Sequence, residues 1–169
     1  MDRPTSYEDD IYAWSQAQAA VLRRLAATRR DLPNELDLEH VAEEIEDVGK
    51  SEVRTVESFL ELLLRHLLKV ASAPEARPGR HWRGEIDIQH RALRKDLKRS
   101  MFQLIELDDV WRTAKLRAEK ALEENGDALV EGLPPAAPFE LEEFLANSFD
   151  IDRAVDRIRR SCADSTAEG

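Results

Sequence analysis

The sequence predicts an all-α protein: a four-helix bundle around one long central helix, with a short helical segment near the C-terminal end. Two observations lead to this prediction. Ala, Leu, Glu and Arg, which favour helices, dominate the 169 residues, whereas only 6 Gly and 7 Pro are present. An apolar stripe with helical spacing also runs in constant phase from Leu38 to Val70, and three further amphipathic segments can cover it.

The first predicted helix follows Thr5 or Ser6, either of which can cap its amino end. The helix is expected to end before Pro33 and Asn34, which interrupt helices. At about 100° per residue, its apolar side chains share one face: Tyr7, Ile11, Trp14, Val21, Leu22 and Leu25.

The central helix is predicted to begin after Asp37, its cap, and to reach about Val70. Gly49 lies inside it and could instead mark a break followed by a second helix. However, the apolar stripe keeps the same phase on both sides of Gly49, and two independent helices would have no reason to share a phase. We therefore expect one continuous helix, in which the missing side chain of Gly49 lets another helix approach closely.

Two further helices are predicted in the second half of the chain. One begins near Trp82 and carries apolar residues on one face. The next is capped by Asp108 or Asp109 and ends at Asn125 and Gly126, which are typical residues after a helix.

The C-terminal part is predicted to be less regular. A short helix over residues 139–146 is expected to dock on the bundle, and one or two helical turns are expected over residues 151–158. The stretch from Ser161 onward is expected to be disordered. We accordingly predict one helical-bundle domain at residues 1–150 and a partly disordered C-terminal extension at residues 151–169.

Composition and charge disfavour several classes of function. The formal net charge of −10 disfavours a dedicated nucleic-acid binder and a binder of anionic membranes, because both need a basic face. No run of about 18 apolar residues occurs, so no membrane-spanning segment is predicted. The single cysteine, Cys162, cannot form a disulfide within the chain, which fits a reducing compartment. We expect a cytoplasmic protein.

Four blocks of the sequence have a distinctive order and spacing. They are Tyr7-x-x-Asp10-x-x-x-Trp14; Leu36-Asp37-Leu38 with Val41-Ala42-Glu43-Glu44-Ile45-Glu46 and Gly49-Lys50-Ser51-Glu52; Leu63-Leu64-Arg65-His66-Leu67-Leu68-Lys69 with Trp82-Arg83; and Pro138-Phe139-x-Leu141-Glu142. Together they resemble the bacterial family known as domain of unknown function twenty-nine, over roughly residues 7–150. The resemblance implies an all-helical fold, and it implies no activity and no catalytic residues. The chain departs from the family at Val70, where many relatives have an aromatic residue, and in the stretch after Asp150.

Several polar residues fall on or beside otherwise apolar stripes. An unpaired polar group in a core costs about 1–3 kcal/mol, so each should have a partner or reach water. One interpretation is a pocket in which Glu52 or His66 performs acid–base or ligand chemistry. The other is a set of structural hydrogen bonds that fix the register of the helices. The candidate polar cluster consists of Gln18, Glu52, His66 and Gln89.

No metal site and no cofactor are predicted. The spacings Asp37-x-x-His40 and Asp87-x-x-His90 resemble half of a di-metal motif, but such a site requires ligands that converge inside the bundle. His40 and Asp87 are expected to point away from the apolar faces of their helices. The chain also has no Gly-rich phosphate loop and no catalytic-serine motif.

Basic residues gather in the third helix, opposite in sign to the acidic first half of the central helix. The simpler interpretation is that the flanks of two neighbouring helices attract each other, each exposed pair contributing about 0–1 kcal/mol. The alternative is a docking face for an acidic partner or for RNA, although the overall charge argues against nucleic acid. The candidate docking face consists of Arg91, Arg94, Lys95 and Lys98.

Two functions from different classes follow from these observations. The first is a non-enzymatic interaction protein that binds an unidentified protein partner, or associates with itself through an apolar face left over on the long helix. The alternative is a small-ligand or metal-dependent enzyme with a polar pocket around Glu52 and His66. Since the sequence contains no catalytic motif, the interaction function is the main prediction.

Overall fold

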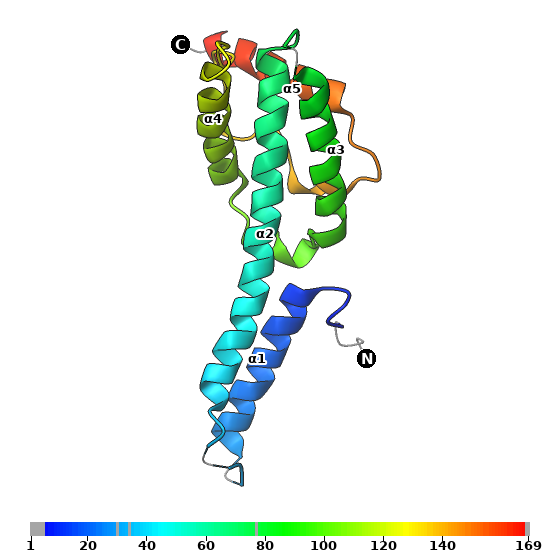
Figure 1. Ribbon diagram of the computed structural model, residues 1–169. Coiled ribbons are helices and arrows are strands. Elements are labelled where there is room, and N and C mark those ends of the chain that lie inside the picture. Colours follow the sequence, from blue (N-terminus) through cyan, green and yellow to red (C-terminus); the bar gives the residue numbers. More distant parts are fainter. Residues whose placement is uncertain (1–5, 30, 34, 77, 168–169) are drawn as a thin grey trace. The chain divides into compact units, whose positions relative to one another are not determined.

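The computed structural model describes residues 6–29, 31–33, 35–76 and 78–167, with side chains through Cys162. This part of the chain contains helices and no strand (Figure 1), so the all-α class and the long central helix are confirmed. The α-helices are α1 (Ile11–Thr28), α2 (Leu38–Ser72), α3 (Gly79–Asp96), α4 (Leu107–Glu123) and α5 (Ile151–Ala167), and the 3₁₀ helices are η1 (Arg99–Met101) and η2 (Leu141–Leu145).

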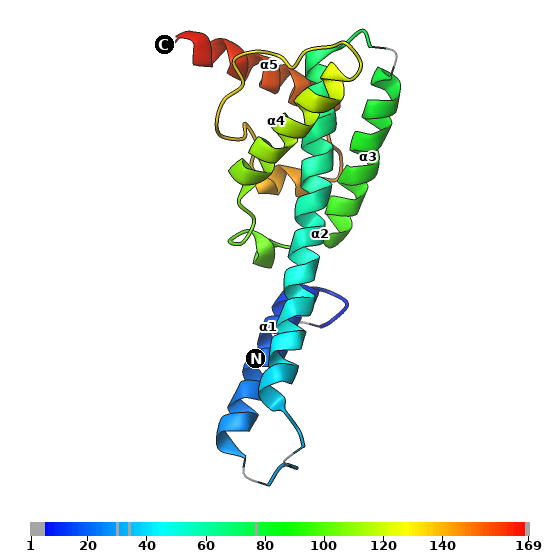
Figure 2. The ribbon, with the colours of Figure 1, turned by 60° about the vertical axis from the view of Figure 1, so that its left-hand side comes forward.

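The chain forms two compact units, and α2 contributes to both. Unit 1 combines Met1–Thr55 with Lys98–Leu104, and unit 2 combines Val56–Leu97 with Ile105–Gly169. The first part of α2 lies beside α1, and the later part belongs with α3, α4 and α5 (Figures 1 and 2).

Asp10, rather than Thr5 or Ser6, caps α1. Its Oδ1 accepts a hydrogen bond from the Ala13 N–H at 2.9 Å, and its Oδ2 accepts one from the Ser100 hydroxyl of η1 at 2.7 Å. The prediction of Ser6 was wrong, because Ser6 lies in the preceding turn and donates its hydroxyl hydrogen to Asp9. Thr5 lies outside the described residues.

α2 is continuous from Leu38 to Ser72, so the predicted passage of one helix through Gly49 is confirmed. The Asp37 carboxylate accepts a hydrogen bond from the His40 N–H at 3.2 Å, which satisfies one of the free donors at the start of a helix. Constant stripe phase therefore outweighed the helix-breaking tendency of a single glycine, which costs only about 1 kcal/mol in a helix interior.

Unit 2 contains the larger apolar core. Its fully buried side chains come from α2, α3, α4 and α5, and they include Leu60, Leu63, Leu64, Leu67, Leu68, Ile86, Leu93, Trp111, Ala114, Ala118, Leu122 and Ile158. The segment predicted as a short helix over residues 139–146 forms η2 over a shorter range. It does dock as predicted, since Phe139, Leu141 and Phe144 are buried.

The C-terminal helix is longer than the sequence analysis predicted. We expected a turn or two over residues 151–158 followed by disorder from Ser161, whereas α5 continues to Ala167. Ala154, Val155, Ile158 and Cys162 are buried, which extends a helical stripe beyond the predicted end. Arg157 adds a polar attachment, because its guanidinium donates to both carboxylate oxygens of Glu143 at 2.7 Å.

Candidate functional site

α1 and the first part of α2 (residues 38–55) form an antiparallel pair, called the hairpin below. The two helices meet along small residues, because Ser15, Ala19, Ala42 and Gly49 are all buried between them. A Cβ atom on Gly49 would overlap the Ser15 hydroxyl and stand 3.2 Å from Ser15 Cβ. Glycine is therefore required here for close approach, as predicted.

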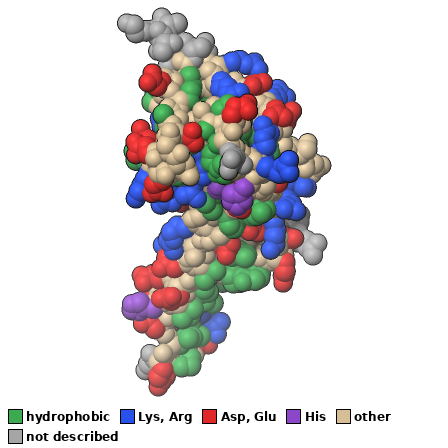
Figure 3. Space-filling view, turned by 45° about the horizontal axis from the view of Figure 1, so that its top comes forward, with side chains coloured by type: hydrophobic (Ala, Val, Ile, Leu, Met, Phe, Trp, Pro, Cys, Tyr) green, Lys and Arg blue, Asp and Glu red, His purple; other side chains and the backbone are tan. Residues whose placement is uncertain are grey.

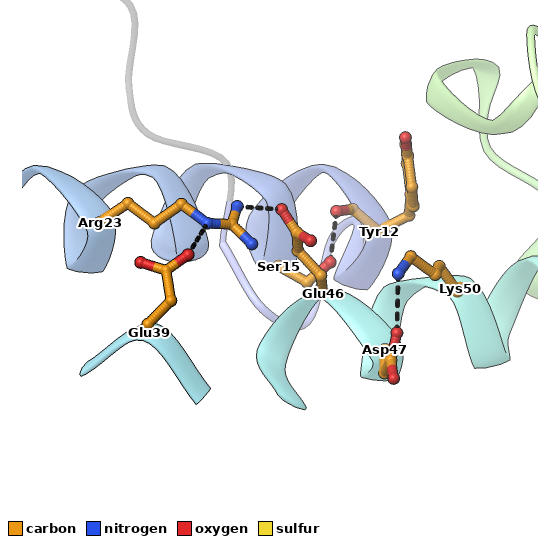
Figure 4. Close-up of polar contacts among 7 residues, drawn as sticks. All are labelled: Tyr12, Ser15, Arg23, Glu39, Glu46, Asp47 and Lys50. Carbon is orange, nitrogen blue, oxygen red and sulfur yellow. Dashed lines mark hydrogen bonds and ion pairs between the residues drawn. The ribbon is translucent and has the colours of Figure 1, made fainter. Parts of the chain in front are cut away.

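One side of the hairpin is held by ion pairs (Figure 4). Arg23 of α1 donates to Glu46 and, at 3.1 Å, to Glu39, both on α2. These two carboxylates raise the pKa of Arg23 above its ordinary value, chiefly through the hydrogen bonds that they accept. The pKa of Glu46 is lowered in turn, mainly by the hydrogen bond from Arg23.

The other side of the hairpin is apolar. A separation of two residues corresponds to about 200° around a helix. Val21 precedes Arg23 by two residues, and Val41 and Val48 follow Glu39 and Glu46 by two residues. The three valines therefore lie on the side of the hairpin away from the ion pairs. The side is built from two stripes with identical spacing. They are Trp14, Gln18, Val21 and Leu25 on α1, and Val41, Ile45, Val48 and Glu52 on α2; together they are called the apolar face.

The apolar face is incompletely covered. Val21 is 39% exposed, Val41 40% and Val48 43%, and the remaining members are half-buried. Figure 3 shows hydrophobic side chains gathered along the hairpin, in the lower part of the view. Tyr7 covers one end, because its ring meets that of Trp14 edge to face with centroids 5.0 Å apart.

Exposed hydrophobic residues are concentrated in unit 1. Among the described residues, eight large hydrophobic side chains are exposed, and only Ile88 and Leu116 belong to unit 2. The six in unit 1 are Tyr7, Val21, Leu36, Val41, Val48 and Leu104. Val21, Val41 and Val48 were predicted to lie on stripes of the core, because their 4-3-4 spacing is the same for a covered stripe and an exposed one.

The four residues of the candidate polar cluster are divided between the units. Gln18 and Glu52 lie half-buried on the apolar face of unit 1, whereas His66 and Gln89 belong to unit 2. His66 is buried, and its Nδ1 lies 2.8 Å from the Leu62 carbonyl oxygen of the preceding turn. The acid–base pocket around Glu52 and His66 therefore stays a prediction.

Unit 2 contains two buried ionisable residues outside the predicted polar cluster. Glu61 is 6% exposed on α2, where its Oε2 accepts a hydrogen bond from Arg117 of α4 at 2.7 Å. His90 is also buried, against the ring of Phe149 at a centroid distance of 5.3 Å. Burial is the largest cause that lowers the pKa of His90, and the nearby charge of Arg94 acts in the same direction. The available signal for Glu61 was its place beside Leu60 within the Leu-rich stripe.

The basic residues proposed as a docking face have varied surroundings. Arg91, Arg94 and Lys95 are exposed on α3, and Lys98 is half-buried in unit 1. Arg94 donates to the side-chain oxygen of Asn147 at 2.9 Å. That contact gives Arg94 a partner within unit 2, and binding of an acidic partner stays a prediction.

Unit 2 also contains an open pocket of about 430 Å³ beside the start of α5. Its lining combines the apolar Phe139 and Phe149 with charges of both signs, from Glu143, Asp150 and Arg153 among others. Arg157, another lining residue, already donates to Glu143. Because apolar groups and charges of both signs are mixed in the lining, the pocket favours no particular class of ligand.

No group of three or more His, Cys, Asp or Glu side chains in the described part of the chain is arranged to hold a metal ion. No described helix combines the length and apolarity needed to cross a membrane.

Comparison with known proteins confirms the family resemblance that the sequence blocks indicated. The family model described as "Domain of unknown function DUF29" matches residues 6–150. A similar crystal structure is that of an alpha-helical protein of unknown function from Rhodospirillum rubrum, which is 40% identical in sequence with a TM-score of 0.85. The match covers 92% of this chain and 99% of that protein. No curated protein matches the chain.

Proposed function

This chain belongs to the DUF29 family, and we propose that it is a non-enzymatic interaction protein whose hairpin is the binding module. The observation that carries the proposal is the apolar face, where Val21, Val41 and Val48 are each about two-fifths exposed. Contiguous exposed apolar surface is typical of protein–protein interaction sites. Its arrangement in two helical stripes fits a helical partner with an apolar stripe of its own.

The physical reason is that the hairpin cannot bury its larger apolar residues by itself. Its two helices meet through Ser15, Ala19, Ala42 and Gly49, which bring the backbones close together but bury little apolar surface. Two helices enclose no core between them, so a third or fourth helix is needed to cover the Val-rich side. A helical partner would supply that cover.

A photo-crosslinking experiment tests this proposal. A benzophenone amino acid is placed at Val41 or Val48 on the apolar face, and at Ile88 or Leu116 as controls, since these are exposed hydrophobic residues outside the hairpin. Irradiation of cells that produce the full chain should yield protein adducts from the two hairpin positions and little from the two controls. Equal yields at all four positions, or no adduct at the hairpin, would contradict the proposed function.

A stability control separates binding from folding. Because Val48 is 43% exposed, Val48→Asp should change the unfolding free energy of the dilute protein by no more than about 0.5 kcal/mol. A large loss of stability would mean that Val48 supports the fold of the hairpin rather than a binding surface.

A further inference from the structure

We infer that the partner of the hairpin is a second copy of the chain, related by two-fold symmetry, with α1 of each copy against α2 of the other. This inference rests on the proposed function and specifies its partner. A two-fold interface uses the same patch on both copies, so the patch must be complementary to itself. The shape and the charge of the apolar face both meet that condition.

Shape complementarity follows from the two stripes. Trp14, Gln18, Val21 and Leu25 have the same 4-3-4 spacing as Val41, Ile45, Val48 and Glu52. When two such hairpins face each other, four stripes of one period meet and can interdigitate in layers, as in four-helix bundles. Each stripe also carries one polar residue, Gln18 or Glu52, and a single polar position is a known device for fixing register in such assemblies.

Charge selects which helices face each other. Beside the apolar face, α1 carries the basic Arg24 and no acidic residue, whereas α2 carries the acidic Glu44. Arg23, Glu39 and Glu46 pair with one another on the other side of the hairpin. Placing α1 on α1, or α2 on α2, would bring like charges together at the rim of the interface. The crosswise arrangement instead brings Arg24 of each copy close to Glu44 of the other, which favours it over the two alternatives.

One pair of residues makes the crosswise arrangement testable. Arg24 stands three residues after Val21 and Glu44 three residues after Val41, so both border the apolar face on their own helices. Both are exposed in the single chain. In the crosswise dimer, Arg24 of each copy lies beside the acidic rim that contains Glu44 of the other.

The first test is the mass of the purified full chain, measured by sedimentation and light scattering over a range of concentrations. The wild type should change from 19.3 kDa toward twice that mass as its concentration rises. Val48→Asp should weaken the dimer about a hundredfold, because a carboxylate would be buried twice in the interface. Leu116→Asp, at an exposed position of α4, should leave the dissociation constant unchanged.

The second test mixes two charge-reversed proteins. Arg24→Glu alone and Glu44→Arg alone should each weaken the dimer about tenfold, because each creates two like-charge contacts. An equimolar mixture should form a heterodimer of about wild-type affinity, since both of its contacts are again between opposite charges. A mixture no tighter than the separate variants would overturn the crosswise arrangement.

The two proposals fail in different ways. A wild-type chain that stays at 19.3 kDa at all concentrations would overturn the inference of a second copy. If crosslinking at Val48 then gave an adduct with a different protein, the proposed function would still stand. If crosslinking gave no adduct at the hairpin, both would be overturned.

Discussion

Gly49 and Ser15 show how single residues set the spacing of the hairpin. The Ser15 hydroxyl donates to the Tyr12 carbonyl at 2.8 Å, which turns the side chain back onto its own helix while Gly49 lies against it. Arg23 then closes one side through Glu39 and Glu46. The missing side chain of Gly49 therefore lets the two helices approach closely, and the ion pairs of Arg23 align them.

Gly49→Ala should destabilise the protein by about 1–3 kcal/mol, because the added methyl group overlaps Ser15 in a closely packed contact. The loss should appear although alanine favours a helix interior by about 1 kcal/mol over glycine. Chemical denaturation measures the difference. Gly84→Ala is the matched control, since nothing lies within 4 Å of a Cβ there and α3 should gain stability. A stabilising Gly49→Ala would show that the helices are not in close contact.

The stability of unit 2 should depend on the protonation of His66. Burial lowers the pKa of His66 below its ordinary value of about 6.5, and Lys69 and Arg65 act in the same direction. In the window between that value and the lower folded-state pKa, the unfolded chain binds a proton that the folded chain does not, so the unfolding free energy falls as the pH falls. His66→Gln should therefore reduce the slope of stability against pH below about 6.5. His81→Gln, at an exposed position, is the control, and equal slopes for both variants would refute the assignment.

Among the elements, α5 shows most clearly how packing determines whether a segment is ordered. Its sequence is highly charged, with Asp152, Arg153, Asp156, Arg157, Arg159 and Arg160. Ile158 is nevertheless fully buried, and Cys162 lies one turn later on the same stripe. Arg159 also donates to the Ala71 carbonyl near the end of α2 at 3.2 Å.

Ile158→Ala should cost about 2–5 kcal/mol of unfolding free energy, because it removes buried methyl groups and leaves a cavity in the core of unit 2. Asp156→Ala, on the exposed side of the same helix, should stay within about 0.5 kcal/mol of the wild type. Thermal and denaturant unfolding measure both. If the two substitutions had equal effects, α5 would not be part of the core.

At the scale of the whole molecule, α2 contributes to two units that bury its apolar stripe to different extents. In unit 2, α2 is covered by other helices and its stripe from Leu60 to Leu68 is fully buried. In unit 1, the same helix has α1 beside it along a seam of small residues, and Val41 and Val48 remain exposed. The incomplete burial in unit 1 is the reason to expect association through the hairpin.

The sequence by itself determined the all-α class, the continuous α2 and the close contact at Gly49. These features depend on periodicity, helix propensity and the absence of a side chain, all of which are local properties of the chain. Only the tertiary structure decided which apolar residues are covered, because a stripe does not specify how many helices will pack on it. For this reason Val41 and Leu63 belong to one sequence pattern, yet Leu63 is fully buried and Val41 is 40% exposed.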